Sequence, residues 1–242
     1  MSNLQIKPIF VKSANVRNFE AMMRTLALSE GEGRFGLVWG RAGRGKTRTA
    51  NYFVANNRNC HYLLALKVWQ SSHGEFLRTL ARELQMTAIP HRIGPLFAEV
   101  AERLAKTKPV VFVDEPDKLP LGFFEVMRDL TEASAAPFVL IGEEELPGIM
   151  RKERRLMSRA FQQVEFKPFA VADIVQYVTA AAGVRFTTPS AAEAMFKSSE
   201  GDIRIVKRDL INLVQALNAK GTAEADENTV KAAIRQALTV GE

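Results

Sequence analysis

The sequence predicts an α/β domain built on a parallel sheet covered by helices, followed by a small helical domain. In the first part of the chain, short apolar runs alternate with amphipathic stretches. These runs are continuous rather than interrupted by polar residues, which is typical of parallel strands buried on both faces. Later in the chain only helical periodicity remains. We therefore expect an α/β domain over residues 1–169 and a helical lid domain over residues 170–242.

The first domain is expected to begin with a helix and then to alternate strands with helices. In residues 13–30, apolar side chains recur at spacings of three and four, and Ser13 can cap the helix start. Strands are predicted at residues 34–40, 62–68, 109–115 and 136–142. Helices are predicted between them at residues 46–57, 74–86, 93–107 and 121–134. This alternation is the order in which a parallel sheet is wound.

The second domain consists of predicted helices at residues 171–183, 190–201, 202–221 and 225–239. Each of them has a capping residue at its start or a glycine at its end. Pro168 interrupts regular structure just before this domain, so the boundary is expected there.

The composition is that of an ordinary globular protein with a moderate positive charge. Apolar residues make up 47% and charged residues 25% of the 242 positions, and the net charge is +6. No apolar run approaches the roughly 20 residues that span a membrane, and the N-terminus lacks a secretory pattern. Cys60 is the single cysteine, which excludes an internal disulfide and fits a reducing cytoplasm. The charge favours an acidic partner such as nucleic acid.

The stretch "GRAGRGKT", from Gly40 to Thr47, carries the signature of a phosphate-binding loop. A predicted strand precedes it and a predicted helix follows, so backbone N–H groups and the helix N-terminus can surround an anion. Lys46 is expected to bind the β- and γ-phosphates and to support catalysis, and the Thr47 hydroxyl to bind Mg²⁺. The residues expected to bind nucleotide are Gly40, Arg41, Ala42, Gly43, Arg44, Gly45, Lys46, Thr47 and Arg48.

The stretch "VVFVDE" is a second expected part of this site. Its apolar residues predict a buried strand that ends in Asp114 and Glu115. In a parallel sheet, that end lies at the edge where nucleotides bind. We expect Asp114 to hold Mg²⁺ together with Thr47, and Glu115 to orient the attacking water. Two carboxylates favour hydrolysis over binding alone, because one is enough for the metal.

With these motifs the chain resembles the AAA+ ATPases over nearly its whole length, which implies ATP and Mg²⁺ as cofactors and ATP hydrolysis as the activity. The segments that carry the resemblance are "GRAGRGKT", "VVFVDE", "PFVLIG", "RRLMSRAF" and "GDIR". The resemblance implies that Arg159 reaches the nucleotide of a neighbouring subunit, with Arg154 and Arg155 as alternatives. It also implies that Arg204 contacts the nucleotide of its own subunit.

One position departs from the AAA+ pattern. These proteins usually place Asn, Ser or Thr at the end of the fourth strand to position the lytic water, whereas Gly142 and Glu143 occupy that region here. A glutamate is a poorer donor and brings negative charge near the phosphates. We therefore expect a slow, switch-like ATPase.

Within the AAA+ group the chain is most similar to the DNA-transposition ATPases, the Mu B, IstB-like and TnsC-like proteins. The compact layout and the stretch "LIGEEELPGIMRKERRLMSRAFQQVEFKPF" carry this likeness. It implies a bacteriophage protein in the cytoplasm of the bacterial host cell, and the lack of a long apolar run predicts no membrane partner. The likeness also implies ATP-dependent homo-oligomers, filaments or rings, on double-stranded DNA of any sequence, and a transposase as partner.

Several basic or aromatic residues are candidates for contact with DNA phosphates or bases. Lys67, Trp69 and His73 follow the second predicted strand, and Lys118 follows the acidic strand end. The full set of candidates is Lys67, Trp69, His73, Arg92, Arg103 and Lys118. Other interpretations stay open, because Lys67 can be a solvated strand end and Trp69 a core residue. The histidines lack metal-ligand spacing, so no zinc site is expected.

Other classes of P-loop protein remain as alternatives. A helicase loader of phage or bacterial replication would bind a replicative helicase and prefer single strands. A secretion-associated ATPase of the ExeA type has a similar core but needs a membrane segment. A nucleoside or shikimate-type kinase would need a pocket for the phosphate acceptor, and its reaction does not require Arg159 or Arg204.

Overall fold

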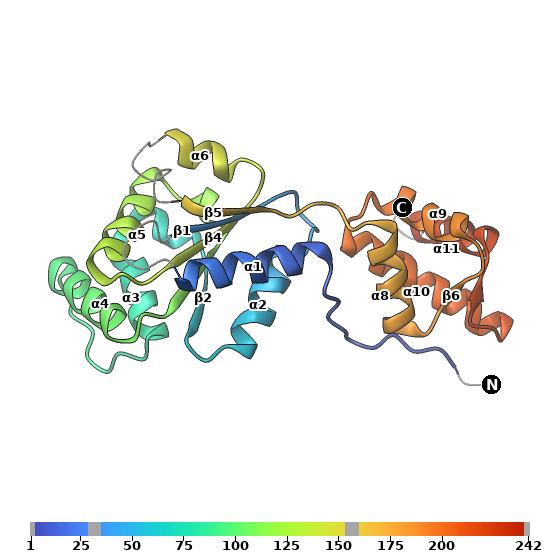
Figure 1. Ribbon diagram of the computed structural model, residues 1–242, viewed down its shortest axis with the longest axis horizontal. Coiled ribbons are helices and arrows are strands. Elements are labelled where there is room, and N and C mark those ends of the chain that lie inside the picture. The colour runs from blue at the N-terminus through green and yellow to red at the C-terminus, as the bar shows by residue number, and fades with distance from the viewer. Residues whose placement is uncertain (1–2, 29–34, 153–159, 240–242) are drawn as a thin grey trace. The chain divides into compact units, whose positions relative to one another are not determined.

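The computed structural model describes residues 3–28, 35–152 and 160–239 (Figure 1). The chain forms two compact units. The α/β unit contains Asn15–Arg41 and Lys46–Phe166. The helical unit contains the N-terminal segment through Ala14, the short stretch Ala42–Gly45 and the chain from Lys167 onward. The chain therefore passes into the helical unit at Lys167, and the N-terminal segment belongs to that unit as well.

The α/β unit is built on a five-stranded sheet in the order β2-β3-β4-β1-β5. All neighbouring strands run parallel. The strands are β1 (Phe35–Trp39), β2 (Cys60–Leu64), β3 (Val110–Asp114), β4 (Phe138–Gly142) and β5 (Ala160–Glu165). This confirms the predicted α/β fold, and it brings the C-terminal ends of all five strands to one edge of the sheet.

Helices cover both faces of this sheet (Figure 1). Alternate residues of a strand point to opposite faces, and β3 divides accordingly: Phe112 packs in one core cluster, whereas Val111 and Val113 pack in the other. The helices are α1 (Ala14–Leu28), α2 (Lys46–Asn56), α3 (His73–Glu83), α4 (Ile93–Thr107), α5 (Leu121–Ser134) and α6 (Leu146–Lys152). The first cluster includes residues of α1 and α2, and the second includes residues of α3, α4 and α5.

The second strand differs from its prediction. β2 spans Cys60–Leu64 instead of residues 62–68, and a 3₁₀-helix, η1 (Lys67–Ser71), follows it. The reason is the length of its neighbour: Leu64 pairs with Asp114, the last residue of β3. Ala65 N makes a last hydrogen bond to Asp114 O at 2.8 Å, after which the chain leaves the sheet. The edge strand β5 was not predicted, because its polar residues lack a continuous apolar run.

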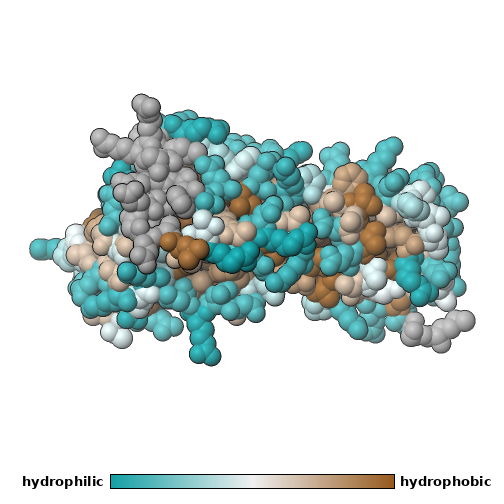
Figure 2. Space-filling model, viewed as in Figure 1, coloured by the Kyte–Doolittle hydropathy of each residue, from teal (hydrophilic) through white to brown (hydrophobic). Residues whose placement is uncertain are grey.

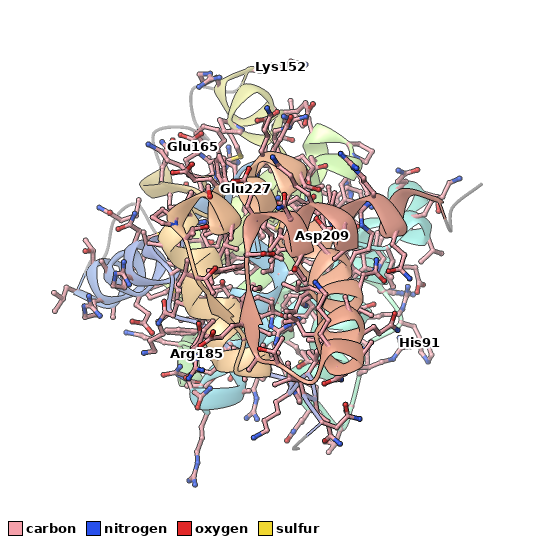
Figure 3. All side chains as sticks on the ribbon, turned by 90° about the vertical axis from the view of Figure 1, so that its right-hand side faces the viewer. His91, Lys152, Glu165, Arg185, Asp209 and Glu227 are labelled. Atoms are coloured by element: carbon pink, nitrogen blue, oxygen red, sulfur yellow. The ribbon has the colours of Figure 1, made fainter. Side chains whose placement is uncertain are left out.

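The helical unit contains the predicted helices, which are α8 (Val171–Ala182), α9 (Pro189–Ser199), α10 (Ile203–Lys220) and α11 (Glu227–Thr239). Two short strands, β6 (Arg185–Phe186) and β7 (Glu224–Ala225), pair in parallel within it. Figure 3 looks onto this unit, with Asp209 on α10 and Glu227 at the start of α11. Gly183 and Gly221 end α8 and α10 in the left-handed conformation that a glycine adopts readily.

The N-terminal segment packs on the helical unit. Its residues Leu4, Ile9 and Val11 contact the apolar cluster of that unit. Leu4 also exchanges two backbone hydrogen bonds with the Asn218 side chain, at 2.7 and 3.0 Å.

Polar side chains cover most of the visible surface, interrupted by small apolar areas (Figure 2). Within the part of the chain that the structure describes, no helix is long and apolar enough to cross a bilayer.

Candidate nucleotide-binding site

The phosphate-binding loop lies between β1, which ends at Trp39, and α2, which begins at Lys46. Gly40 has a φ of 142°, which side chains rarely allow, and a Cβ atom there would lie 2.5 Å from Phe166 O. Gly45 has a φ of 89°. The close passage of the backbone past Phe166 therefore requires Gly40, and the left-handed turn at Gly45 brings the chain into α2.

Lys46 is a buried cation at the start of α2, with 7% of its surface exposed. Its Nζ donates hydrogen bonds to Gly40 O and to Arg41 O, the latter at 3.0 Å. It also forms an ion pair with Glu143, with 3.2 Å between Nζ and Oε1. These contacts place the ammonium group inside the loop, where phosphate oxygens can replace some of its partners.

Thr47 and Asp114 are brought together by the sheet. The Thr47 hydroxyl donates to Asp114 Oδ2 at 2.6 Å, and Glu115 N donates to Asp114 Oδ1 at 3.0 Å. Asp114 is 2% exposed, so its carboxylate is fixed by these contacts. A hydroxyl and a carboxylate oxygen in contact are hard oxygen donors of the kind that Mg²⁺ prefers. The pair therefore fits the expected magnesium position.

Tyr62 is a site residue that the sequence did not indicate. Its hydroxyl donates to the same oxygen, Asp114 Oδ2, at 2.7 Å. Burial raises the pKa of Tyr62, and the nearby Asp114 and Glu115 carboxylates raise it further, so the hydroxyl stays protonated at neutral pH. The contact depends on the pairing of β2 with β3, which no local pattern in the sequence reveals.

Glu115 follows Asp114 in a left-handed conformation, with a φ of 59°. Its backbone N donates to Ile141 O at 2.7 Å, which ties it to the end of β4. Its carboxylate forms an ion pair with Lys118. Burial raises the pKa of the neighbouring Asp117, with a further contribution from the Glu143 and Glu115 carboxylates. Acidic groups therefore gather at the ends of β3 and β4.

The middle of the loop, Ala42–Gly45, makes its contacts within the helical unit. Arg44 is buried and donates to Glu200 O at 2.6 Å, and Ile203 N donates to Gly43 O at 3.0 Å. In contrast, Arg41, Ala42 and Arg48 are exposed. The guanidinium of Arg44 is thus held by a backbone carbonyl, and its expected role in nucleotide binding stays a prediction.

Four arginines outside the phosphate-binding loop were expected to contact a nucleotide, and the structure describes one of them, Arg204. The Arg204 side chain is 64% exposed and forms an ion pair with Asp202, at 2.7 Å between Nη2 and Oδ2. Arg154, Arg155 and Arg159 lie outside the described residues. Contact of these four arginines with nucleotide stays a prediction.

Trp69 was predicted as a DNA contact, and this prediction is wrong. The indole is fully buried and packs edge-on against Phe76, with 5.2 Å between ring centroids. The turn of η1 directs Trp69 into the apolar cluster between the sheet and α3. A residue at that depth stabilises the core and cannot stack on a nucleic-acid base.

The other DNA candidates are at the surface. Lys67, His73, Arg92 and Arg103 are exposed. The His73 ring packs on Phe123, with 4.5 Å between centroids. The last candidate is Lys118, which pairs with Glu115 as described above. Contact of these residues with DNA stays a prediction.

The family model described as "AAA domain" matches residues 29–150, about half of the chain. The Mu-like prophage FluMu DNA transposition protein B of Haemophilus influenzae is 28% identical over 208 residues, which cover 82% of this chain and 70% of that protein. The ATP-dependent target DNA activator B of Escherichia phage Mu is 30% identical over 166 residues, 68% of this chain. The match spans only about half, 52%, of the phage protein.

Solved structures share the fold. Cdc6p of Pyrobaculum aerophilum superposes with a TM-score of 0.64 and 14% identity, covering 90% of this chain and 65% of that one. The RuvB Holliday junction branch migration motor of Thermotoga maritima gives a TM-score of 0.58 and 20% identity, covering 89% of this chain and 68% of that one. At these identities the likeness concerns the fold alone. The chain belongs to the AAA domain family, as a P-loop ATPase similar to the B proteins of Mu-like phages.

Proposed function

We propose that this ATPase binds Mg²⁺-ATP at the loop between β1 and α2 and hydrolyses it slowly. Lys46 binds the β- and γ-phosphates, and Thr47 and Asp114 hold the metal, which neutralises charge on the phosphates. Glu115, just beyond Asp114, orients the attacking water. The contact between the Thr47 hydroxyl and the buried Asp114 carboxylate supports this assignment, because it joins two motifs that are 67 positions apart in the chain.

We further propose that ATP drives assembly of the protein on double-stranded DNA, and that the assembly recruits or stimulates a transposase. The observation that carries this proposal is the similarity to the phage Mu protein, which is named an ATP-dependent target DNA activator. The net charge of +6 and the exposed Lys67, Arg92 and Arg103 are compatible with contact to phosphates rather than bases.

The test is DNA binding on long duplex and on single strands, with ATP, with ADP and without nucleotide. We expect binding to duplex with ATP, a steep decrease with salt and little dependence on sequence, because phosphate contacts dominate. The variant Lys46→Ala should lose ATP binding and, with it, assembly on DNA. A preference for single strands would favour a helicase loader instead, and binding that is independent of ATP would contradict the proposal.

The assembly should need an arginine from the adjoining subunit. We propose Arg159 for this role, since a guanidinium can pair bidentately with the γ-phosphate that ATP presents and ADP lacks. Arg159→Ala should keep ATP binding but lose ATP-dependent assembly and hydrolysis. Light scattering with DNA and ATP, beside a nucleotide-binding assay, measures both, and Arg151→Ala on the exposed end of α6 is the matched control. Full assembly and hydrolysis by Arg159→Ala would move the role to Arg154 or Arg155.

A further inference from the structure

Glu143 begins the turn after β4, and its carboxylate contacts the Lys46 ammonium at 3.2 Å. An ammonium group has three N–H donors. The Gly40 and Arg41 carbonyls and the Glu143 carboxylate are three acceptors for them. A phosphate oxygen that binds Lys46 must therefore displace one of these partners.

The three partners differ in how easily they can be displaced. The Gly40 and Arg41 carbonyls belong to the backbone of the phosphate-binding loop itself. The Glu143 carboxylate is at the end of a side chain that is 44% exposed, so it can rotate into solvent. An incoming phosphate is also an anion that accepts hydrogen bonds from an ammonium group, so it can take the place of the carboxylate. Glu143 is thus the partner that is displaced most easily.

The backbone keeps Glu143 beside the site even after its side chain has moved. A Cβ atom at Gly142 would lie 2.5 Å from Asp117 Oδ1 and 2.8 Å from Leu146 Cδ2, so the chain passes tightly between these groups. Leu146 N donates to Glu143 O at 3.1 Å, which closes the turn. A displaced Glu143 carboxylate therefore stays near the phosphates and repels them.

We propose that Glu143 is a built-in counter-ion of Lys46, which competes with the nucleotide and weakens ATP binding more than ADP binding. The difference follows from charge, because ATP carries the additional γ-phosphate that Lys46 contacts. This inference rests on the proposed ATP site and adds to it a residue that sets affinity. Glu143 lies in the region where AAA+ proteins usually have Asn, Ser or Thr, and in this role it lowers the affinity for ATP.

The experiment compares Glu143→Gln with the wild type and with Glu144→Gln, which neutralises the exposed next residue of the same turn. Affinities for ATP and ADP are measured by calorimetry at low and high salt. We expect Glu143→Gln to bind ATP about fivefold more tightly, as for loss of one partly exposed charge contact. The gain should be smaller for ADP and should shrink at high salt, where charges are screened. Glu144→Gln should behave as the wild type.

Two outcomes would overturn the inference while leaving the ATP site intact. One is a Glu143→Gln variant that binds ATP more weakly, or with unchanged affinity and an unchanged hydrolysis rate, beside a wild type that binds ATP normally. The other is unchanged affinity with reduced hydrolysis, which would make Glu143 a water-positioning residue. Absence of ATP binding in the wild type would instead reject the proposed function itself.

Discussion

Lys46 and Asp114 of the nucleotide site lie in the same α/β unit as the candidate DNA contacts, yet the side chains of the two groups are held very differently. Lys46 and Asp114 are 7% and 2% exposed, and each has several hydrogen-bond partners. Lys67, Arg92 and Arg103 are exposed at the surface. A single small ligand with concentrated charge needs fixed partners, whereas a long polyanion can be bound by scattered mobile cations. Loss of one side chain should therefore have large effects in the first region and small effects in the second.

Among Glu115, Tyr62 and the surface cations, the largest effect is expected for Glu115, which directly follows the buried Asp114 at the end of β3. Glu115→Gln should keep ATP binding and lower the hydrolysis rate by about 10²–10⁴, the range for one group that acts on the attacking water. Assemblies formed with ATP should then persist longer. A phosphate-release assay beside a binding assay measures both quantities. Normal hydrolysis would show that Glu115 is a solvated carboxylate paired with Lys118.

An intermediate effect is expected for Tyr62, which acts on the nucleotide site through Asp114. Tyr62→Phe removes the hydroxyl that donates to Asp114 Oδ2, so the carboxylate should be held less firmly for Mg²⁺. We expect the Mg²⁺ concentration needed for half-maximal ATP binding to rise about fivefold, as for loss of one hydrogen bond. Tyr52→Phe, which removes a hydroxyl from α2, should leave it unchanged. An unchanged requirement in Tyr62→Phe would reduce Tyr62 to a packing role.

The smallest effect is expected for single cations of the surface. Arg92→Ala and Arg103→Ala should each weaken duplex binding modestly and lower the slope of log affinity against log salt by about 1. ATP binding should stay as in the wild type. Lys231→Ala, which removes a cation paired with Glu227 in the helical unit, is the control. If one of these arginine variants abolished DNA binding, the contrast between a fixed and a dispersed site would be wrong.

Local sequence patterns were sufficient to predict much of the fold and the centre of the nucleotide site. The buried strands are continuous apolar runs, and the loop from Gly40 to Thr47 is one contiguous motif, so its chemistry can be read without the fold. The buried end of β3 likewise follows from apolar residues before Asp114. The helices of the helical unit were predicted because their apolar periodicity and end glycines are local signals as well.

The tertiary structure decided what depends on partners that are distant in the chain. The chain leaves the sheet after Leu64 because β2 has no partner beyond Asp114, the last residue of β3. The turn that follows places Trp69 in the core. Tyr62 reaches Asp114 only because β2 and β3 pair in one register. Glu143 meets Lys46 across 97 positions because β4 lies beside β1. Sequence patterns carry information on burial and local turns, whereas these contacts depend on strand order and register, which the packing of the whole sheet determines.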